Sequence, residues 1–550
     1  MAYLTRFIGN RHYTDQNKHI TLLRLFRLRN LVRFSTSSRA PSKGSSFVED
    51  RQSVAITPRH ENYSAWYNDL IVAADLMDGS PVRGCMVIKP WGMSLWDLLR
   101  SELDKRITES GTQNAYFPLF IPKSFLAKEA EHVEGFAKEC AVVTHHRLCL
   151  SEDGKDLIPD PTAALEEPLV VRPTSETIIW HMFGKWIRSH RDLPLKINQW
   201  ANVVRWEMRT RPFLRSSEFL WQEGHTAHAT KAEAMFTAKE SLDMYASICK
   251  DMLAMPVIKG EKSPAERFAG ADNTFTIEAL MQNGWALQSG TSHFLGQNFA
   301  KAFDVHYQAD SGARELVWAT SWGVSTRLVG ALIMSHSDDK GLVLPPAVAP
   351  VQVVLVPINA EKSPKGEVQQ AIEAVFSALS ARNIRVKVDD RTHLRPGAKY
   401  FEWERKGVPI RLDIGPRDAA NQVAVMNLRH NGEKEVVSIG NVNDLTNKIQ
   451  DTLASIQKSL FESASARVNA KTFRVTSYEQ MKELLGQDQT GFYLVPWKCN
   501  TANENAIKEE CKATIRCYPF EQNKQAPLAG VKCFYSGDQA THMALFARAY

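Results

Sequence analysis

Polar and apolar residues alternate along residues 203–208, VVRWEM. An alternation with a period of two is typical of a β-strand whose two faces differ in chemistry. The pattern predicts a strand with an active face that includes Arg205 and a packed face that includes Trp206 and Met208. After a proline-containing loop, residues 219–224 predict a second strand, and the two together predict an antiparallel hairpin.

Similar patterns predict the other elements of the first half of the chain. Residues 62–76 and 95–107 carry apolar residues at helical spacing, whereas the apolar run 115–121 predicts a strand. Residues 170–172 predict a strand that stops at a proline, and residues 174–176 then open a helix. A Thr-Ser-Glu sequence at a helix start is often only a cap, so residues 174–176 allow that interpretation.

Two further segments are rich in small and polar residues. Residues 288–297 are dense in Gly, Ser, Thr and Gln, and by themselves they predict a loop. Gly290 and Gly296 allow a ligand to approach the backbone closely. Residues 321–333 turn helical near Arg327, and a lone arginine at a helix start normally faces solvent.

The second half alternates between strand and helix patterns after a Pro-Pro linker at residues 345–346. Alternation of this kind predicts a small α/β domain with a mixed sheet. The predicted strands are residues 351–357, 384–388, 410–414 and 423–428, and the predicted helices are residues 366–381 and 399–406. A long helix at residues 444–467 leads into a final segment, residues 470–550.

Composition narrows the class of protein. The 550 residues are 44% hydrophobic and 23% charged, which predicts three or four ordinary globular domains. No run of 18 apolar residues occurs, so the sequence predicts no membrane insertion. The net charge of +6 is compatible with a nucleic-acid partner and equally with a slightly basic enzyme. Eight scattered cysteines without a CxxC pair argue against a secreted disulfide framework.

Residues 1–48 differ in composition from the rest of the chain. They contain seven arginines, two lysines and a single acid, Asp15, and they end in a serine-rich tail. Leucines and arginines alternate at residues 22–33 in a pattern that predicts a short basic amphipathic helix. These features predict a transit peptide for the mitochondrion, the plastid or both. The alternative is a basic RNA-binding arm, which would leave the protein cytoplasmic.

Charged residues crowd the predicted hairpin. Burial of an unpaired charge is costly, so these side chains should pair with one another or face a polar ligand. The charged residues concerned are Arg205, Glu207, Arg209, Glu223 and His225. A guanidinium on a rigid strand can bind a phosphate through two parallel hydrogen bonds. The alternative is a ladder of ion pairs between the two strands.

Five stretches together resemble a known family. They are RWEMR with FLWQEGH at residues 205–225, VVRPTSET at 170–177, FAGAD at 268–272, QSGTSHFLGQNF at 288–299 and SWGVSTRLVGALI at 321–333. The first resembles the second signature motif of class II aminoacyl-tRNA synthetases, and the last resembles the third. In this form and order, which covers most of residues 53–345, the chain is similar to prolyl-tRNA synthetases.

The resemblance implies an α+β fold with several domains. It implies a class II catalytic core with an antiparallel sheet at residues 49–343, an α/β anticodon-binding domain at 344–450, and a linker helix with a small C-terminal α+β domain at 451–550. Residues 389–418 match the prolyl version of the anticodon-binding domain, although any one cation there can equally belong to a solvated basic face. Too few residues separate Glu223 from Gln288 for an inserted editing domain, which implies the eukaryotic and archaeal-like type.

The resemblance also assigns site residues. The implied proline site consists of Thr174, Glu176, Arg205, Phe219, Trp221, Glu223, His225, Phe268 and His293. The implied ATP site consists of Arg205, Glu207, Arg215, Ser216, Gln288, Thr291, Ser325 and Arg327. Arg205, Glu207 and Arg327 are the expected catalytic residues. The two arginines are fixed cations that stabilise phosphoryl charge in the transition state, and Glu207 is expected to orient the adenylate. Mg²⁺ is the expected partner of ATP, held in part by Glu207.

Further expectations concern partners and rivals. Proline, ATP and tRNA(Pro) are the implied substrates, and the first motif, at residues 95–121, implies a homodimer, although core packing explains the same residues. Cys499, Cys511, Cys517 and Cys533 lack the paired spacing of a zinc knuckle, so no structural zinc is expected. The rivals are a synthetase-like protein without catalysis and a synthetase for threonine or serine.

Overall fold

The computed structural model describes residues 55–127, 139–363, 366–525 and 528–550. The transit-peptide prediction for residues 1–48 lies outside these described residues. Residues 51–550 form one compact unit. Among the helices of the described residues, none is long and apolar enough to cross a bilayer.

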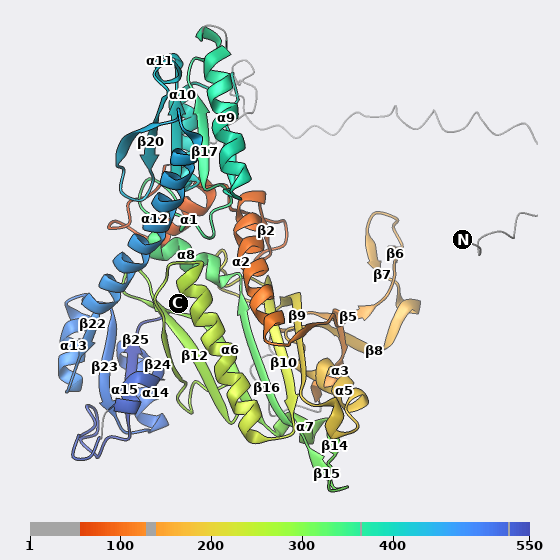
Figure 1. The fold of residues 1–550 in the computed structure, drawn as a ribbon. Coiled ribbons are helices and arrows are strands. Elements are labelled where there is room, and N and C mark those ends of the chain that lie inside the picture. The colour runs from red at the N-terminus through yellow and green to blue at the C-terminus, as the bar shows by residue number, and fades with distance from the viewer. Residues whose placement is uncertain (1–54, 128–138, 364–365, 526–527) are drawn as a thin grey trace, which may run out of the picture. The chain divides into compact units, whose positions relative to one another are not determined.

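In the part of the chain that the structure describes, eleven strands form one sheet, in the order β22-β23-β25-β24-β11-β12-β13-β16-β10-β9-β3 (Figure 1). Its strands are β3 (Gln113–Asn114), β9 (Leu195–Val204), β10 (Glu218–His228), β11 (Ile258–Glu261), β12 (Asn273–Leu280), β13 (Ala286–Gly296), β16 (Trp318–Ser325), β22 (Thr472–Arg474), β23 (Phe492–Trp497), β24 (Thr514–Pro519) and β25 (His542–Ala547). Neighbouring strands run antiparallel except at the two ends, where β3 follows β9 and β22 follows β23 in parallel. The predicted antiparallel core is confirmed.

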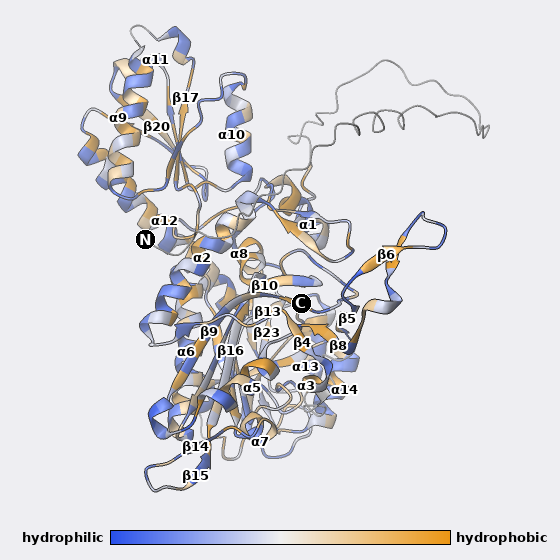
Figure 2. Ribbon diagram, turned by 90° about the vertical axis from the view of Figure 1, so that its right-hand side faces the viewer, coloured by the Kyte–Doolittle hydropathy of each residue, from blue (hydrophilic) through white to orange (hydrophobic). Residues whose placement is uncertain are grey.

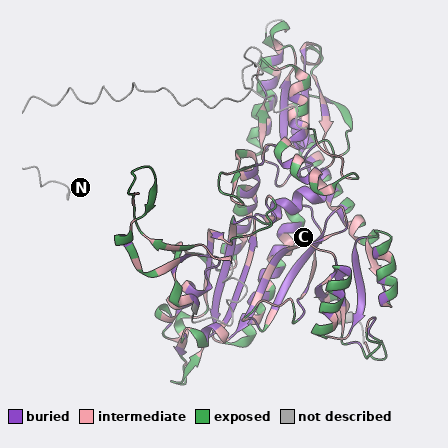
Figure 3. Cartoon of the chain, turned by 180° about the vertical axis from the view of Figure 1, so that it is seen from behind, coloured by how far each residue is buried: buried purple, intermediate pink, exposed green. Residues whose placement is uncertain are grey.

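Helix α6 (Lys231–Asp251) lies along β12, β13 and β16 and covers one face of the sheet (Figure 1). A capping box opens this helix, because Thr230 and Glu233 bond each other's backbone N–H groups. Its buried residues recur at helical spacing and include Leu242 and Tyr245, whose ring lies 6.2 Å from that of Trp322. Figure 3 shows the central strands and this helix face as buried. Helix α6 therefore supports the sheet that carries the pocket residues.

Other elements complete the N-terminal half. The helices are α1 (Tyr63–Ala73), α2 (Pro90–Glu109), α3 (Lys123–Ala127), α5 (Glu176–Trp186), α7 (Asn298–Ala302) and α8 (Arg327–His336). The strands outside the large sheet are β1 (Met77–Gly79), β2 (Met86–Ile88), β4 (Phe120–Pro122), β5 (Val142–His145), β6 (Leu148–Leu150), β7 (Leu157–Pro159), β8 (Ala164–Val171), β14 (His306–Gln308) and β15 (Arg314–Leu316). The predicted helices at residues 62–76 and 95–107 correspond to α1 and α2.

The second half contains the predicted mixed sheet, in the order β18-β17-β19-β20-β21, with parallel pairs around β17 and antiparallel pairs beyond β19. Its elements are β17 (Val353–Pro357), β18 (Val386–Val388), β19 (Ile410–Ile414), β20 (Val423–Leu428), β21 (Lys434–Ser438), α9 (Glu367–Ala381), α10 (Pro396–Arg405) and α11 (Pro416–Ala420). The sequence prediction lacked β21, whose residues are mostly exposed and show no clear apolar period.

A long helix connects this sheet to the C-terminal segment. The remaining helices are α12 (Val442–Ala470), α13 (Tyr478–Gly486), α14 (Thr501–Cys511) and α15 (Phe520–Gln525). The strands of the C-terminal segment do not form a sheet of their own, because β24 pairs with β11 of the large sheet. The end of the chain thus reaches the region that carries the candidate site.

Several local predictions were wrong. The strand predicted for residues 203–208 ends at Val204. The prediction of a packed face was also wrong, because Trp206 is 48% exposed and Met208 is 73% exposed. The strand predicted for residues 115–121 is confined to residues 113–114 and 120–122. Residues 288–297 are not a loop, since most of them belong to β13, where ladder hydrogen bonds to two neighbours outweigh weak strand propensity.

Candidate active site

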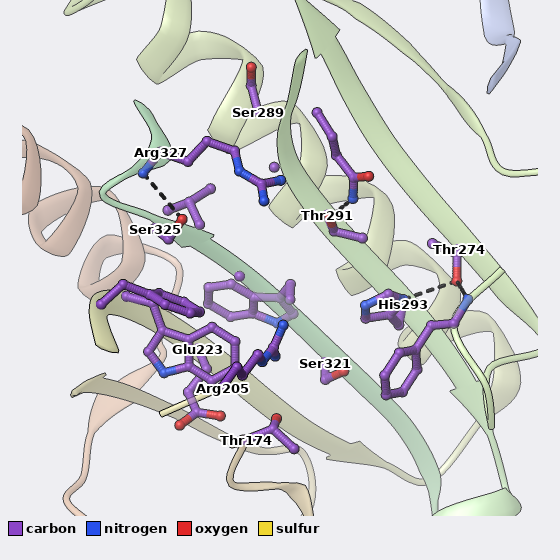
Figure 4. Close-up of a pocket in the computed structure, with 18 of the residues that line it drawn as sticks. Thr174, Arg205, Glu223, Thr274, Ser289, Thr291, His293, Ser321, Ser325 and Arg327 are labelled. Carbon is purple, nitrogen blue, oxygen red and sulfur yellow. Dashed lines mark hydrogen bonds between the residues drawn. The ribbon is translucent and has the colours of Figure 1, made fainter. Parts of the chain in front are cut away.

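One cavity of about 390 Å³ opens over the hairpin β9–β10 and the strands β12, β13 and β16. Every site residue named from the sequence lines it: Thr174, Glu176, Arg205, Glu207, Arg215, Ser216, Phe219, Trp221, Glu223, His225, Phe268, Gln288, Thr291, His293, Ser325 and Arg327. Figure 4 draws Arg327 and Ser325 on one side of the cavity and His293 and Thr274 on the other. The sequence stretches that are far apart in the chain therefore form one site.

Arg205 directly follows the last residue of β9, at the end of the hairpin. Its backbone N–H donates to Ser217 O at 2.8 Å, and its Nε donates to Pro173 O at 3.0 Å. The guanidinium carbon lies 5.7 Å from the ring centroid of Phe219 and 5.4 Å from that of Trp221, within cation–π distance. Burial lowers the pKa of Arg205, although the carboxylates of Glu176 and Glu223 act in the opposite direction. The cation is thus held in a partly desolvated position, where its field is strong.

A buried polar network lies beneath the hairpin. Glu223 accepts hydrogen bonds from Ser175 Oγ at 2.5 Å and from Gln199 Nε2 at 2.8 Å, and it lies 3.0 Å from His225 Nε2. Burial opposes ionisation of both partners, but their mutual hydrogen bond and charge lower the pKa of Glu223 and raise the pKa of His225. Ser175 occupies the N-cap position of α5, but its hydroxyl makes no capping hydrogen bond and donates to Glu223 instead.

Four pocket side chains carry a buried polar atom without a hydrogen-bond partner among the described residues. The atoms are His225 Nδ1, Trp221 Nε1, Ser321 Oγ and Trp322 Nε1. A buried polar group without a partner costs free energy, so such atoms call for water or a ligand. Their position in the same cavity indicates that a polar ligand binds there.

The far side of the pocket is aromatic and carries the carboxylate of Glu176. The ring of Phe268 lies 4.5 Å from that of His293, and Thr274 Oγ1 lies 3.0 Å from His293 Nδ1. Burial, together with the charge of His225, lowers the pKa of His293 to about 3. His293 is therefore neutral at physiological pH. Thr174 donates to Glu176 nearby, so one hydroxyl and one carboxylate face the same space.

The opposite side gathers cations. Arg327 begins α8 and donates from its Nε to Leu214 O at 3.1 Å. Burial and the neighbouring charges of Arg215 and Arg205 lower the pKa of Arg327 to about 10, which leaves the guanidinium charged. Arg215 Nε lies 3.5 Å from Glu207 Oε1. Both residues lie in the loop between β9 and β10, so this ion pair is not a rung of the alternative ladder between the hairpin strands.

The sequence prediction missed several residues of the lining. They are Lys262, Glu266, Thr274, Ser289, Ser321, Trp322, Gly323, Val324, Phe213 and Leu214. Most lie one or two positions from a predicted residue on β12, β13 or β16. The available signal was the strand pattern, since residues on one face recur every second position. Lys262 and Glu266 directly precede the FAGAD stretch and gave no signal of their own.

Two further cavities lie in the described part of the chain. One, of about 490 Å³, includes Tyr400, Glu404, Arg411 and Asn427 beside the mixed sheet, and the guanidinium of Arg411 lies 3.8 Å from the ring centroid of Tyr400. The other, of about 190 Å³, adjoins the arginine-rich side of the first cavity and includes Arg209 and Tyr550. Among the described residues, no group of three His, Cys, Asp or Glu side chains is placed to hold a metal ion.

Three family models match the chain. Residues 162–336 match the tRNA synthetase class II core domain (G, H, P, S and T), residues 352–449 match an anticodon binding domain, and residues 478–550 match the C-terminal domain of prolyl-tRNA synthetase. The three matches follow one another in the order expected from the sequence motifs.

Similar proteins agree with these matches. A proline–tRNA ligase of Porphyromonas gingivalis is 54% identical over 495 residues, which is 90% of this chain and 99% of that protein. A proline–tRNA ligase of Flavobacterium johnsoniae is 53% identical over the same shares. Crystal structures of prolyl-tRNA synthetase from Cryptosporidium parvum, with halofuginone and AMPPNP or with L-proline and AMP, align with TM-scores of 0.83 and 0.80. They are 40% and 38% identical, and each covers 90% of this chain.

Proposed function

The chain belongs to the prolyl-tRNA synthetase family, which makes it an ATP-dependent proline–tRNA ligase, and we propose how its pocket performs that reaction. The pocket activates L-proline with ATP to prolyl-adenylate and then transfers the prolyl group to tRNA(Pro). The observation that carries this proposal is the single cavity that combines an aromatic, carboxylate-bearing side with an arginine-rich side.

Proline binds at the side formed by Thr174, Glu176 and the aromatic residues. The secondary ammonium group of proline pairs with the Glu176 carboxylate and the Thr174 oxygen, because the pyrrolidine ring offers no other cationic group. Phe219, Trp221 and Phe268 surround the apolar ring, and neutral His293 completes the rim. The Glu223–His225 pair lies behind this slot, where the free Nδ1 of His225 can meet the ligand.

ATP binds on the arginine side. Arg327 contacts the far phosphate, while Arg215 and Ser216 lie in the segment that covers the adenine. Gln288, Thr291 and Ser325 line the same side, and Gln288 donates to Thr291. Guanidinium groups match phosphate oxygens with two parallel hydrogen bonds, which fixes the chain of phosphates in one direction.

Arg205 joins the two substrates. The proline carboxylate attacks the α-phosphate, pyrophosphate leaves, and negative charge grows on the transferred phosphoryl oxygens. A preorganised cation in a partly desolvated site stabilises that charge more than it stabilises the ground state. Arg205 can contact both the carboxylate and the α-phosphate, since it lies between Thr174 and Arg327 (Figure 4).

Magnesium fits the ATP side on the chemistry of its residues. Mg²⁺ prefers oxygen ligands and commonly takes few carboxylates with phosphates and water. Glu207 supplies a half-buried carboxylate in the lining. When bound, Mg²⁺ shares the negative charge of the phosphates.

In the second step, the terminal ribose hydroxyl of tRNA attacks the adenylate carbonyl, and AMP leaves. The cavity beside the mixed sheet fits a recognition role for unstacked bases. There, Tyr400 and Arg411 provide flat faces for stacking, and Glu404 and Asn427 provide polar edges.

We propose that the enzyme is a homodimer, and exposed apolar residues support this. The strands β6 and β7 form an arm on which Leu148, Leu150 and Leu157 are 57%, 66% and 59% exposed. Figure 2 draws hydrophobic residues along this arm and hydrophilic residues at its tip. A two-stranded arm with this much exposed leucine is costly in water, and a second copy of the chain would cover it.

The subtype and the location are proposals as well. The region between β10 and β13 contains only α6, β11 and β12, which supports the eukaryotic and archaeal-like architecture without an inserted editing domain, even though similar proteins are bacterial. The bacterial relatives cover 90% of the chain, and the basic residues 1–48 support an organellar transit peptide, in mitochondria or plastids. A fusion of residues 1–60 to a fluorescent protein tests this, and a diffuse cytosolic signal would refute it.

We propose the domain division 1–48, 49–343, 344–450 and 451–550, with no structural zinc. Cys511 packs against Tyr478, whose hydroxyl lies 3.1 Å from its Sγ, and Cys517 is buried among apolar residues, so both have roles in packing. Elemental analysis of protein purified without chelator tests this proposal. One tightly held zinc per chain would overturn it.

The function is tested by ATP–pyrophosphate exchange. Proline should support exchange, whereas threonine and serine should not, because the slot surrounds a ring and not a hydroxyl. Exchange with threonine or serine alone would favour the rival synthetases. Normal binding of proline and ATP without exchange would favour a synthetase-like protein without catalysis.

A further inference from the structure

A loop beside the pocket is held by residues from the far end of the chain. The loop comprises residues 262–268 and follows β11 directly. It contributes Lys262, Glu266 and Phe268 to the lining of the pocket. Because Phe268 packs on His293, the position of this loop sets one wall of the pocket.

The sheet provides the first attachment of the loop. Gly260 lies opposite Pro519, and Glu261 lies opposite Tyr518, in the pairing of β11 with β24. A Cβ atom at Gly260 would lie 2.6 Å from both Cys517 Sγ and Tyr518 O, closer than real Cβ contacts. Glycine therefore permits the close approach of the two strands. The chain enters the loop from a position that the C-terminal segment fixes.

A buried ion triad provides the second attachment. Glu278 of β12 is fully buried and accepts from Lys262 Nζ at 2.9 Å and from Arg516 Nε at 3.0 Å. The side chains of Lys262 and Arg516 are 2% and 8% exposed. Removal of one partner of a buried ion pair leaves an uncompensated charge, so the triad acts as a unit. Arg516 comes from β24, and it thus controls the carboxylate that holds Lys262.

Helix α14 provides the third attachment. Ser263 Oγ donates to Glu504 Oε1 at 2.7 Å, and both residues are buried. Lys508, one turn further along the helix, lies 3.3 Å from Glu266 Oε1. The second contact is half exposed and therefore weak, whereas the buried hydrogen bond has no competition from water.

We propose that the C-terminal segment, residues 472–550, positions the active pocket, with Arg516 and Glu504 as positioning residues that hold the loop 262–268 and through it Phe268. Neither residue lines the pocket, so each acts through the loop. This inference deepens the proposed function and rests on it. The loop borders the proline side, and Arg516 should therefore govern proline binding more than ATP binding.

The test compares the KM values of proline and ATP in exchange assays of Arg516→Ala, Arg516→Lys and Glu504→Ala. Loss of one buried hydrogen bond should raise the KM of proline by roughly 5- to 10-fold in Arg516→Ala and Glu504→Ala. The KM of ATP should change by less than about 2-fold, which a general loss of structure would not produce. Arg516→Lys should recover part of the effect, since lysine keeps the charge that Glu278 needs.

Lys482→Ala is the matched control, because it removes an exposed ion pair with Glu510 in the same segment, and it should leave both KM values unchanged. Wild-type exchange with proline in the same assay tests the proposed function separately. If Arg516→Ala does not fold, the KM values of proline and ATP for Glu504→Ala decide whether the inference holds. An unchanged proline KM in folded variants, or a parallel rise of both KM values, would overturn the inference.

Discussion

Buried ionisable residues line the pocket, and their different surroundings give them different charge states. His225 pairs with Glu223, His293 is kept neutral, and Arg327 remains charged although burial lowers its pKa. The aromatic side with neutral His293 suits an apolar ring, and the arginine-rich side suits phosphates. This contrast arises from burial and from near neighbours, and neither is visible in a residue's identity alone.

Glu504 gives a pH-dependent prediction at the residue scale. Burial raises the pKa of Glu504 to about 7, although Ser263 and Lys508 act in the opposite direction. The folded state therefore binds a proton that the unfolded state releases near pH 4.5. The stabilising effect of this proton is fully present below about pH 4.5 and is lost as the pH rises through about 7.

Glu504→Gln should consequently raise the melting temperature at pH 8 and have little effect near pH 5, because glutamine is neutral and keeps an acceptor for Ser263. Thermal unfolding of both proteins across this pH range measures the difference. A difference that is constant from pH 5 to pH 8 would contradict the raised pKa.

Several helices and strands could be predicted from the sequence. The hairpin, α1, α2 and the mixed sheet were predictable, because their apolar residues recur with a clear period. The predicted site residues also met in one cavity, since the resemblance to class II synthetases assigned each of them through a motif, even where the predicted element was wrong.

The remainder depended on long-range pairing. β13 is a strand because β12 and β16 flank it, and the segment 205–208 leaves the sheet because the chain must turn into the loop that covers the pocket. The contacts of Glu278 with Arg516 join residues 238 positions apart. No local pattern encodes such a contact.

The pairing of β10 with β16 predicts how a substitution on β10 changes the stability of the protein. Gly224 lies opposite Trp322, and a Cβ atom at Gly224 would lie 2.2 Å from the indole. Gly224→Ala should destabilise the protein by about 1–3 kcal/mol, since the buried ring must shift. Gly79→Ala is the control, because no heavy atom lies within 4 Å of its added Cβ. Denaturant unfolding measures both, and equal stabilities would show that the sheet accommodates the methyl group.

At the scale of the whole molecule, the end of the chain is part of the catalytic framework. β24 extends the sheet that carries the pocket, and Tyr550 N–H donates to Ala286 O at the start of β13. Residues 478–550 of this segment match the C-terminal domain model of prolyl-tRNA synthetases.

The exposed arm predicts the assembly state. Leu150 and Leu157 are direct partners in the β6–β7 pair and are both more than half exposed. Leu150→Asp with Leu157→Asp should yield monomers, because burial of two carboxylates in the interface is unfavourable. Lys155→Ala, at the exposed tip, should leave the dimer intact. Light scattering coupled to size-exclusion chromatography measures the mass of the protein in solution, and a monomeric wild-type protein would refute the homodimer.

The central claim is that one pocket, centred on Arg205, joins proline to ATP, and the exchange rate of Arg205→Ala tests it most directly. The variant should retain its fold and lose at least ~100-fold in proline-dependent ATP–pyrophosphate exchange, the scale for one preorganised donor to a developing anion. Arg205→Lys should recover little, because an ammonium group cannot form the paired hydrogen bonds. A folded Arg205→Ala enzyme that exchanges at nearly the wild-type rate would contradict the account.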